Sequence, residues 1–209
     1  MRVTEHVRDA EAHTRLLDAQ ERDRAAAFAR PADRHRYLVA HVALRRLLGE
    51  RLGVPPQDVV TTRQPCQGCG GPHGRPVVPG DPVHFSLSHS GDLVMIALAE
   101  TPVGADVEEV PELRTVDDTA GMLHAAEHSA LSALDGARRP AAFARCWTRK
   151  EAYLKATGAG LTEDLSATHV GAGPDPQPLA GWLITDHAVP HGYAAATAVR
   201  RPGGGPPDA

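Results

Sequence analysis

Carboxylate and ammonium groups stand at suggestive spacings in two short segments of the sequence. The first, residues 103–108, reads VGADVE and alternates as a strand does. Residues i and i+2 of a strand point to the same face, about 6.5–7 Å apart, so Asp106 and Glu108 would present two carboxylates side by side. In the second segment, Glu151 and Lys155 are four residues apart, a spacing that places both on one face of a helix.

These four side chains suit a site that handles phosphate. Neighbouring carboxylates repel each other unless a cation lies between them, and hard oxygen ligands favour Mg²⁺ or Mn²⁺ over zinc. Asp106, Glu108 and Glu151 would supply the carboxylates of a magnesium site, with Lys155 beside them where phosphate charge develops. Each pair also has an ordinary explanation, either a solvent-facing strand edge or an exposed Glu–Lys pair that contributes a few tenths of a kcal/mol. Spacing alone does not bring the two segments together.

The N-terminal part of the chain has the periodicity of helices. Apolar residues recur at helical spacing, with charges between them, in residues 14–30 and 33–52. Asp33 can cap the second helix, and Gly53, which two prolines follow closely, ends it. Residues 61–82 are rich in glycine and proline and are predicted to form a loop.

After this loop the pattern changes to that of strands. HFSLSHS (84–90) and LVMIALAE (93–100) are predicted strands, separated by a turn at Ser90-Gly91-Asp92. The remaining predicted elements are a strand at 103–108, helical regions at about 116–134 and 140–157, and final strands at 179–189 and 191–200.

The order helices, strands, helices, strands predicts an α+β fold. We expect two α+β halves, residues 1–101 and 102–200, which meet near residues 100–104. The tail, residues 201–209, is too poor in apolar groups to fold and is predicted to be disordered.

Composition narrows the classes of function. The chain has 209 residues and a formal net charge of −4, which argues against partners that reward a basic face, such as nucleic acid or an anionic membrane. It has no N-terminal apolar run of signal-peptide length and no run of about 20 apolar residues that could span a bilayer. Three cysteines, an odd number, fit reduced thiols better than a disulfide framework. We therefore expect a soluble, cytoplasmic protein.

Three motifs together resemble one known family. Residues 85–108, FSLSHSGDLVMIALAETPVGADVE, contain Ser-His-Ser and Gly-x-Asp-x-Glu, and residues 143–161, FARCWTRKEAYLKATGAGL, contain Trp-x-x-Lys-Glu-x-x-x-Lys. This order and spacing resemble the 4′-phosphopantetheinyl transferases of the long, monomeric Sfp-like type. The likeness extends upstream to residues 21–53 and 73–76 and downstream to 191–198, so it covers nearly the whole chain.

The resemblance implies a reaction and a fold. The phosphopantetheine arm of coenzyme A would pass to a serine hydroxyl of an acyl or peptidyl carrier protein, releasing 3′,5′-ADP. Such carriers serve polyketide, nonribosomal peptide or fatty acid synthesis, the first two being secondary metabolism and a source of antibiotics. The fold would be two similar α/β halves related by a pseudo-twofold axis, each a small, mainly antiparallel sheet packed with helices. The active site would lie in the cleft between the halves of a monomer.

Matching the motifs residue by residue implies roles for the charged groups. Asp106, Glu108 and Glu151 would hold Mg²⁺, or Mn²⁺. Glu151 would also be the general base, directly or through a metal-bound water, because a serine hydroxyl is a poor nucleophile until its proton has an acceptor. Lys155 would stabilise the leaving phosphate, and Lys150 would lie close by, against the same pyrophosphate.

The same matching implies a set of contacts with coenzyme A: Arg24, Arg36, Arg75, Pro76, Ser88 and His89. Arg75 replaces a lysine of the family, which keeps the charge and adds a bidentate fork. Glu21 stands where some members carry a lysine, so the nucleotide end of the pocket departs from the family. The two N-terminal arginines also fit an ordinary helix surface, and the histidine also fits a partly buried structural role.

Residues 119–131 depart from the family as well. Where relatives carry paired aromatics near the surface that contacts the carrier protein, this chain has Met122 and Leu123. They could receive the apolar side of a carrier helix, since methionine adapts to varied partners, or simply pack a helix onto the sheet.

Two other classes of protein share some of these features. Cys66, Cys69 and His73 offer three zinc ligands where a closed structural site needs four, so we expect this loop to be reduced and without zinc. A zinc-knuckle binding module there would leave most of the chain unexplained. A metal-dependent nuclease also uses Asp and Glu on a strand with a later Glu and Lys, but the acidic net charge and the Glu-x-x-x-Lys spacing disfavour it.

Overall fold

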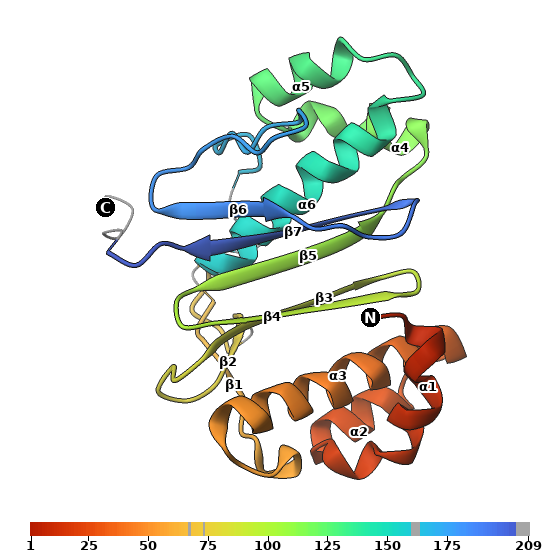
Figure 1. Cartoon of the computed structure of the whole chain (residues 1–209), viewed down its shortest axis with the longest axis vertical. Coiled ribbons are helices and arrows are strands. Elements are labelled where there is room, and N and C mark those ends of the chain that lie inside the picture. The colour runs from red at the N-terminus through yellow and green to blue at the C-terminus, as the bar shows by residue number, and fades with distance from the viewer. Residues whose placement is uncertain (67, 73, 160–163, 204–209) are drawn as a thin grey trace.

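The structure, a computed structural model, describes residues 1–66, 68–72, 74–159 and 164–203 (Figure 1). Its elements in the N-terminal part are helical up to residue 58. They are α1 (Val3–Ala12), the 3₁₀ turn η1 (Thr14–Leu16), α2 (Ala19–Ala26), α3 (Pro31–Leu52) and the 3₁₀ turn η2 (Pro56–Asp58).

This helical region differs from the sequence prediction, which placed no helix at residues 3–12. The predicted helix at 14–30 is divided at Asp18, whose side chain accepts a hydrogen bond from the Glu21 amide and so caps α2. Asp33 does not cap α3, because Pro31 already begins that helix, and it lies instead in the first turn, where an acidic residue suits the helix dipole. Gly53 ends α3 at φ 68°, as predicted.

The strands are short and pair antiparallel. They are β1 (Thr62–Arg63), β2 (Pro76–Val77), β3 (His84–Ser90), β4 (Leu93–Ala99), β5 (Val103–Glu109), β6 (Trp182–Asp186) and β7 (Tyr193–Arg200). Strands β3 and β4 form the predicted hairpin, whose turn residue Gly91 has φ 52°. A second sheet has the order β5-β7-β6.

The C-terminal helices are α4 (Leu113–Thr119), the 3₁₀ turn η3 (Ala120–Met122), α5 (Ala125–Ser132) and α6 (Arg139–Thr157). The predicted helix at 116–134 is thus interrupted, since His124 caps a new helix with its imidazole. Helix α6 packs on the sheet β5-β7-β6, and helices α1 to α3 lie at the opposite end of the molecule, beyond the β3–β4 hairpin (Figure 1). The architecture is α+β, with small antiparallel sheets and helices, as predicted.

The core is divided between these two ends of the molecule. One cluster of buried side chains joins α1, α2 and α3 to the β3–β4 hairpin, and a larger one joins α4, α5 and α6 to β6 and β7. Strands β3 and β5 lie side by side where these two regions meet (Figure 1). No helix within the described ranges is long and apolar enough to cross a membrane.

Candidate active site

A glycine in β5 brings helix α6 close to the strand. A Cβ atom placed on Gly104 would lie 1.9 Å from the carbonyl oxygen of Ala152 and 2.6 Å from the amide nitrogen of Ala156. Only glycine allows this approach of two backbones. Because Glu151 and Lys155 precede these two alanines in α6, the contact sets both charged residues against the acidic part of β5.

The structure brings Asp106 and Lys155 together. Asp106 is 1% exposed, and the Lys155 Nζ lies 2.5 Å from its Oδ1. Lys155 also donates to the carbonyl oxygen of Ala105 at 3.3 Å. The strand segment at 103–108 and the helix that carries Glu151 and Lys155 therefore meet, and the explanation of Asp106 as a solvent-facing strand edge is wrong.

Glu108 and Glu151 lie close enough to feel the Asp106 charge. Burial raises the pKa of Glu151, the carboxylates of Asp106 and Glu108 raise it further, and Lys155 partly offsets them. Burial also raises the pKa of Glu108, with a further contribution from Asp106, while a hydrogen bond from Ser90 opposes the increase. The three carboxylates thus form one acidic cluster. Burial and mutual repulsion make the charged forms of Glu108 and Glu151 less favourable than they are in water.

This cluster is not arranged as a finished metal site. No three carboxylate, imidazole or thiol groups of the described residues converge closely enough to hold a metal ion as they stand. Asp106 Oδ1 is taken by Lys155, whereas Oδ2 is buried and has no hydrogen-bond partner among the described residues. A buried carboxylate oxygen without a partner is costly, and a cation would satisfy it.

Alternate serines of β3 connect that strand to β5. Ser86 Oγ accepts a hydrogen bond from the Ala105 amide at 3.0 Å, and Ser90 Oγ accepts one from the Glu109 amide at 3.2 Å. Ser88, between them, donates to Asp106 Oδ1 at 2.7 Å. The hydroxyls of these three serines therefore connect β3 to β5.

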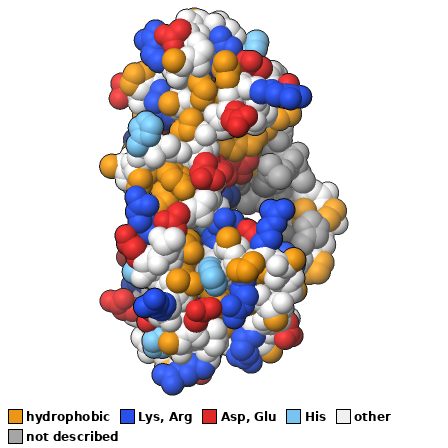
Figure 2. Space-filling model, turned by 90° about the vertical axis from the view of Figure 1, so that its right-hand side faces the viewer, with side chains coloured by type: hydrophobic (Ala, Val, Ile, Leu, Met, Phe, Trp, Pro, Cys, Tyr) orange, Lys and Arg blue, Asp and Glu red, His pale blue; other side chains and the backbone are white. Residues whose placement is uncertain are grey.

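The basic residues predicted to meet coenzyme A lie on separate elements. Arg36 Nε donates to the Gly91 carbonyl oxygen at 2.9 Å, which ties α3 to the β3–β4 turn. His89, on β3, is exposed, and its pKa is lowered by partial desolvation and then by positive neighbours that include Arg36. Figure 2 shows one face of the molecule with a hollow at mid-height, where acidic side chains lie above the hollow and basic side chains and a histidine lie below it.

The remaining predicted contacts with coenzyme A are Arg75, Pro76 and Arg24. Arg75 reaches across to α6, where its Nη1 donates to the Ala156 carbonyl oxygen at 2.8 Å. Pro76 is half-buried in β2. Arg24 is exposed on α2, with its guanidinium 5.2 Å from the centre of the Phe28 ring.

Two residues that the resemblance assigned to binding surfaces, Lys150 and Leu123, are buried in the structure. Lys150 is 1% exposed and pairs with Glu127 at 2.9 Å inside the C-terminal half. It precedes Lys155 by five residues, and only residues three or four apart share a helix face, so the two lysines point in different directions. Leu123 is 3% exposed and belongs to the core of that half, so it packs a helix and offers no surface to a partner. Met122, at 50% exposure, remains on the surface.

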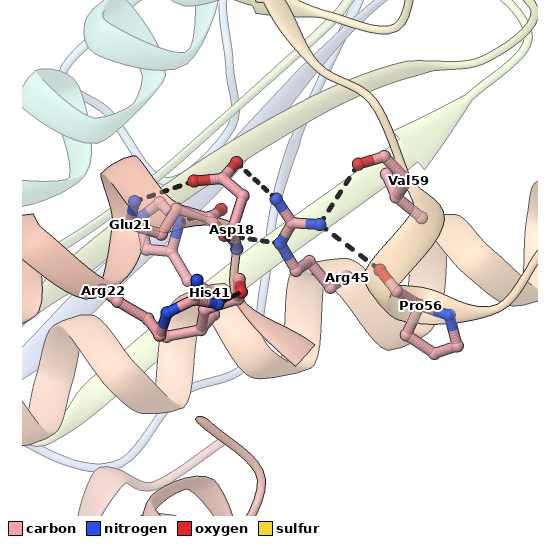
Figure 3. Close-up of polar contacts among 8 residues, drawn as sticks. Asp18, Glu21, Arg22, His41, Arg45, Pro56 and Val59 are labelled. Atoms are coloured by element: carbon pink, nitrogen blue, oxygen red, sulfur yellow. Dashed lines mark hydrogen bonds and ion pairs between the residues drawn. The ribbon is translucent and has the colours of Figure 1, made fainter. Parts of the chain in front are cut away.

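Glu21 has a structural role that the sequence did not indicate. Arg45 is almost fully buried and pairs with both Asp18 and Glu21, each at 2.5 Å (Figure 3). Burial would raise the pKa of Glu21, but hydrogen bonds from His41, the Asp18 amide and Arg45 lower it overall. Glu21 therefore anchors α2 to α3 as a carboxylate, where a lysine would face Arg45.

The buried Lys150–Glu127 pair gives a prediction about stability. Glu127 is 0% exposed and also accepts hydrogen bonds from the amides of Val170 and Gly171. Lys150→Met would leave the buried Glu127 carboxylate without a cation, so we expect the free energy of unfolding to fall by about 3–5 kcal/mol in urea titrations. Arg114→Met, which removes an exposed pair, should change it by no more than about 1 kcal/mol. Equal losses in the two variants would contradict the prediction.

The cysteine loop is described only in part. Cys66 is half-buried and Cys69 is exposed, while His73 lies outside the described residues. Hydrogen bonds from the amides of Cys69 and Gly68 lower the pKa of Cys66. Whether the loop binds zinc stays a prediction, as does the state of the tail, of which residues 204–209 are also outside the described part.

Comparison with known proteins identifies the family. Residues 102–198 match the model of the 4′-phosphopantetheinyl transferase superfamily, and residues 5–101 match that of the 4′-phosphopantetheinyl transferase N-terminal region. The chain therefore belongs to the 4′-phosphopantetheinyl transferases and is an enzyme of that class. Within the class it is of the Sfp-like type, as its relatives indicate.

Three of these relatives illustrate the likeness. The 4′-phosphopantetheinyl transferase psf-1 of Bacillus pumilus is 30% identical over 176 residues, which are 84% of this chain and 71% of the relative. A putative 4′-phosphopantetheinyl transferase of Synechocystis, slr0495, is 32% identical over 72% of this chain and 61% of its own length. The 4′-phosphopantetheinyl transferase Sfp of Bacillus subtilis is 25% identical over 90% of this chain and 84% of its own.

Proposed function

We propose that this enzyme transfers the 4′-phosphopantetheine arm of coenzyme A to a serine hydroxyl of an acyl or peptidyl carrier protein, releasing 3′,5′-ADP. The observation that carries the proposal is the meeting of Asp106, Glu108 and Glu151 with Lys155 where β5 and α6 touch. Family membership supplies the reaction class. The site would lie in a cleft between halves 1–101 and 102–200 of a monomer.

Asp106, Glu108 and Glu151 would hold Mg²⁺ or Mn²⁺. Two features support the fit: the buried Asp106 Oδ2 without a partner among the described residues, and the raised pKa values of Glu108 and Glu151. All three donors are hard carboxylate oxygens, which these cations prefer. Such a cation, when bound, neutralises charge on a pyrophosphate.

Glu151 would take the proton from the carrier serine. Its carboxylate lies in the acidic cluster near Asp106 and Glu108, and a positioned carboxylate can accept a hydroxyl proton directly or through one water. Deprotonation allows the serine oxygen to attack the β-phosphorus of coenzyme A, and the bond from that phosphorus to the 3′,5′-ADP oxygen breaks. The Lys155 ammonium, now on Asp106, would donate to the leaving phosphate.

The basic residues would bind coenzyme A around this centre. His89 lies close enough to Arg36 and Lys155 to feel both charges, and Arg75 donates to the Ala156 carbonyl oxygen near the end of α6. Pro76 and the exposed Arg24 complete the proposed contact set.

The carrier protein would dock beside the acidic cluster. Pro111, Thr115, Phe143 and Trp147 line a cavity of about 280 Å³ that Glu108 also borders. Met122, which is exposed and follows Thr115 by seven residues, would add an apolar contact. We expect the rim of the docking surface to be apolar or locally basic, despite the negative net charge of the chain.

The proposed reaction is tested by mass spectrometry of intact apo carrier proteins. Each carrier is incubated with the enzyme, coenzyme A and Mg²⁺, and a parallel sample contains EDTA. We expect the carrier mass to increase by roughly 340 Da, and only when the metal is present. No increase across a panel of acyl and peptidyl carriers would contradict the proposal, and an increase that survives EDTA would contradict the role of the cation.

A further inference from the structure

Ser88 differs from Ser86, two residues before it on β3, in what it contacts. Ser86 Oγ accepts from a backbone amide of β5, a bond that joins the strands and involves no charged group. Ser88 Oγ instead donates to the Asp106 carboxylate, at 2.7 Å. It also accepts a hydrogen bond from Lys155 Nζ, at 3.1 Å, so it contacts both partners of the buried ion pair.

The only donor of the Ser88 hydroxyl is used in this arrangement. Ser88 is 8% exposed, and its one proton is directed to Asp106. Because a hydroxyl carries a single hydrogen, Ser88 has no donor left for a phosphate oxygen while this bond is made. The contact that the motif suggested, with a phosphate of coenzyme A, would first require the bond to Asp106 to break.

The two donors on Asp106 fix the rotation of its carboxylate. Ser88 and Lys155 both bind Oδ1, which turns Oδ2 away from them into a buried position with no partner among the described residues. If Lys155 moves onto a phosphate, as the proposed reaction requires, Ser88 remains as the donor on Oδ1. The carboxylate then keeps its orientation, with Oδ2 still available.

We propose that Ser88 is a positioning residue, which orients the Asp106 carboxylate so that Oδ2 faces a divalent cation. This inference rests on the proposed function, because it needs that cation. It assigns Ser88 to the acidic cluster and removes it from the set of coenzyme A contacts. Loss of a residue that orients a metal ligand typically lowers metal affinity about 10- to 100-fold.

The test compares Ser88→Ala with Ser86→Ala, a matched control that loses a hydroxyl from the same strand junction. Mn²⁺ binding to each full-length protein is followed by electron paramagnetic resonance of the free ion, and coenzyme A binding is measured by calorimetry without metal. We expect Ser88→Ala to weaken Mn²⁺ binding about 10-fold or more with coenzyme A affinity unchanged. Ser86→Ala should keep wild-type Mn²⁺ affinity even if its melting temperature falls, and Ser88→Thr, which retains the hydroxyl, should restore binding.

Three results would overturn the proposal. Weaker coenzyme A binding with unchanged Mn²⁺ affinity in Ser88→Ala would make Ser88 a phosphate contact. Equal Mn²⁺ affinity in the two alanine variants would make it structural. Wild-type protein that binds no Mn²⁺ would overturn the cation site itself, which separates that failure from failure of the Ser88 assignment. If Ser88→Ala does not fold, Ser88→Cys keeps the side-chain size with a weak donor, and the same loss of Mn²⁺ affinity is expected.

Discussion

Glu151→Gln should reduce the rate of phosphopantetheine transfer at least about 100-fold, because a positioned general base contributes about 10²- to 10⁴-fold to a rate. Glutamine keeps the size of the side chain but cannot accept the serine proton. Coenzyme A affinity without metal should change little, since Arg36, Arg75 and His89, which would bind it, lie outside α6. The rate is measured by the mass increase of a carrier protein over time, and the affinity by calorimetry.

Glu100→Gln is a suitable control for this experiment. Glu100 is exposed and pairs only with Arg51 among the contacts described, so its loss of charge is the same but lies outside the acidic cluster. We expect wild-type transfer from this variant. Wild-type transfer from Glu151→Gln would remove Glu151 from the mechanism.

Gly104→Ala should both destabilise the protein and abolish most of its activity. The added methyl group would lie 1.9 Å from the Ala152 carbonyl oxygen, so α6 has to move away from β5. Overpacking of this kind costs about 1–3 kcal/mol and occasionally more. Because α6 carries Glu151 and Lys155, its movement also separates them from Asp106, and a displacement of about 1 Å can lower a rate about 100-fold.

Thermal unfolding and transfer rate are measured together for this variant. Gly121→Ala is the control, because a Cβ atom at Gly121 would meet no atom within 4 Å. It should melt close to the wild type and retain full activity. A Gly104→Ala variant with wild-type activity would show that the close contact of α6 with β5 does not position the site.

The sequence was informative where one element carries its own pattern. The alternation of VGADVE predicted a strand with Asp106 and Glu108 on one face, and β5 runs over these residues. The i, i+4 spacing of Glu151 and Lys155 likewise predicted one helix face, and α6 places both residues near Asp106. Short-range periodicity sets these features, so no knowledge of the rest of the fold was needed.

Features that depend on contacts between elements were harder to predict. The resemblance placed Lys150 against the pyrophosphate, yet Lys150 pairs with Glu127 on α5, and nothing in the spacing of the two residues indicates that they meet. The role of Ser88 likewise depends on β3 lying beside β5. Gly104 was the one available signal, since a glycine within a strand often marks close approach of another backbone.

The prediction of helix boundaries failed for a local reason. The division of residues 14–30 at Asp18 follows from a capping box with Glu21, a pattern visible in the sequence but hidden by the continuous helical periodicity around it. Helix α1 was not predicted at all. Of its residues only Val3 and Ala10 are buried, which leaves little apolar periodicity to detect.

The claim that Asp106, Glu108 and Glu151 form the cation site of the transferase is tested most directly by anomalous diffraction. Crystals of the enzyme with coenzyme A and Mn²⁺ would be measured on both sides of the manganese absorption edge. We predict an anomalous peak within ligand distance of the three carboxylates, about 2.0–2.6 Å for ions of this class, with Asp106 contributing Oδ2. A peak that none of these carboxylates contacts would contradict the account.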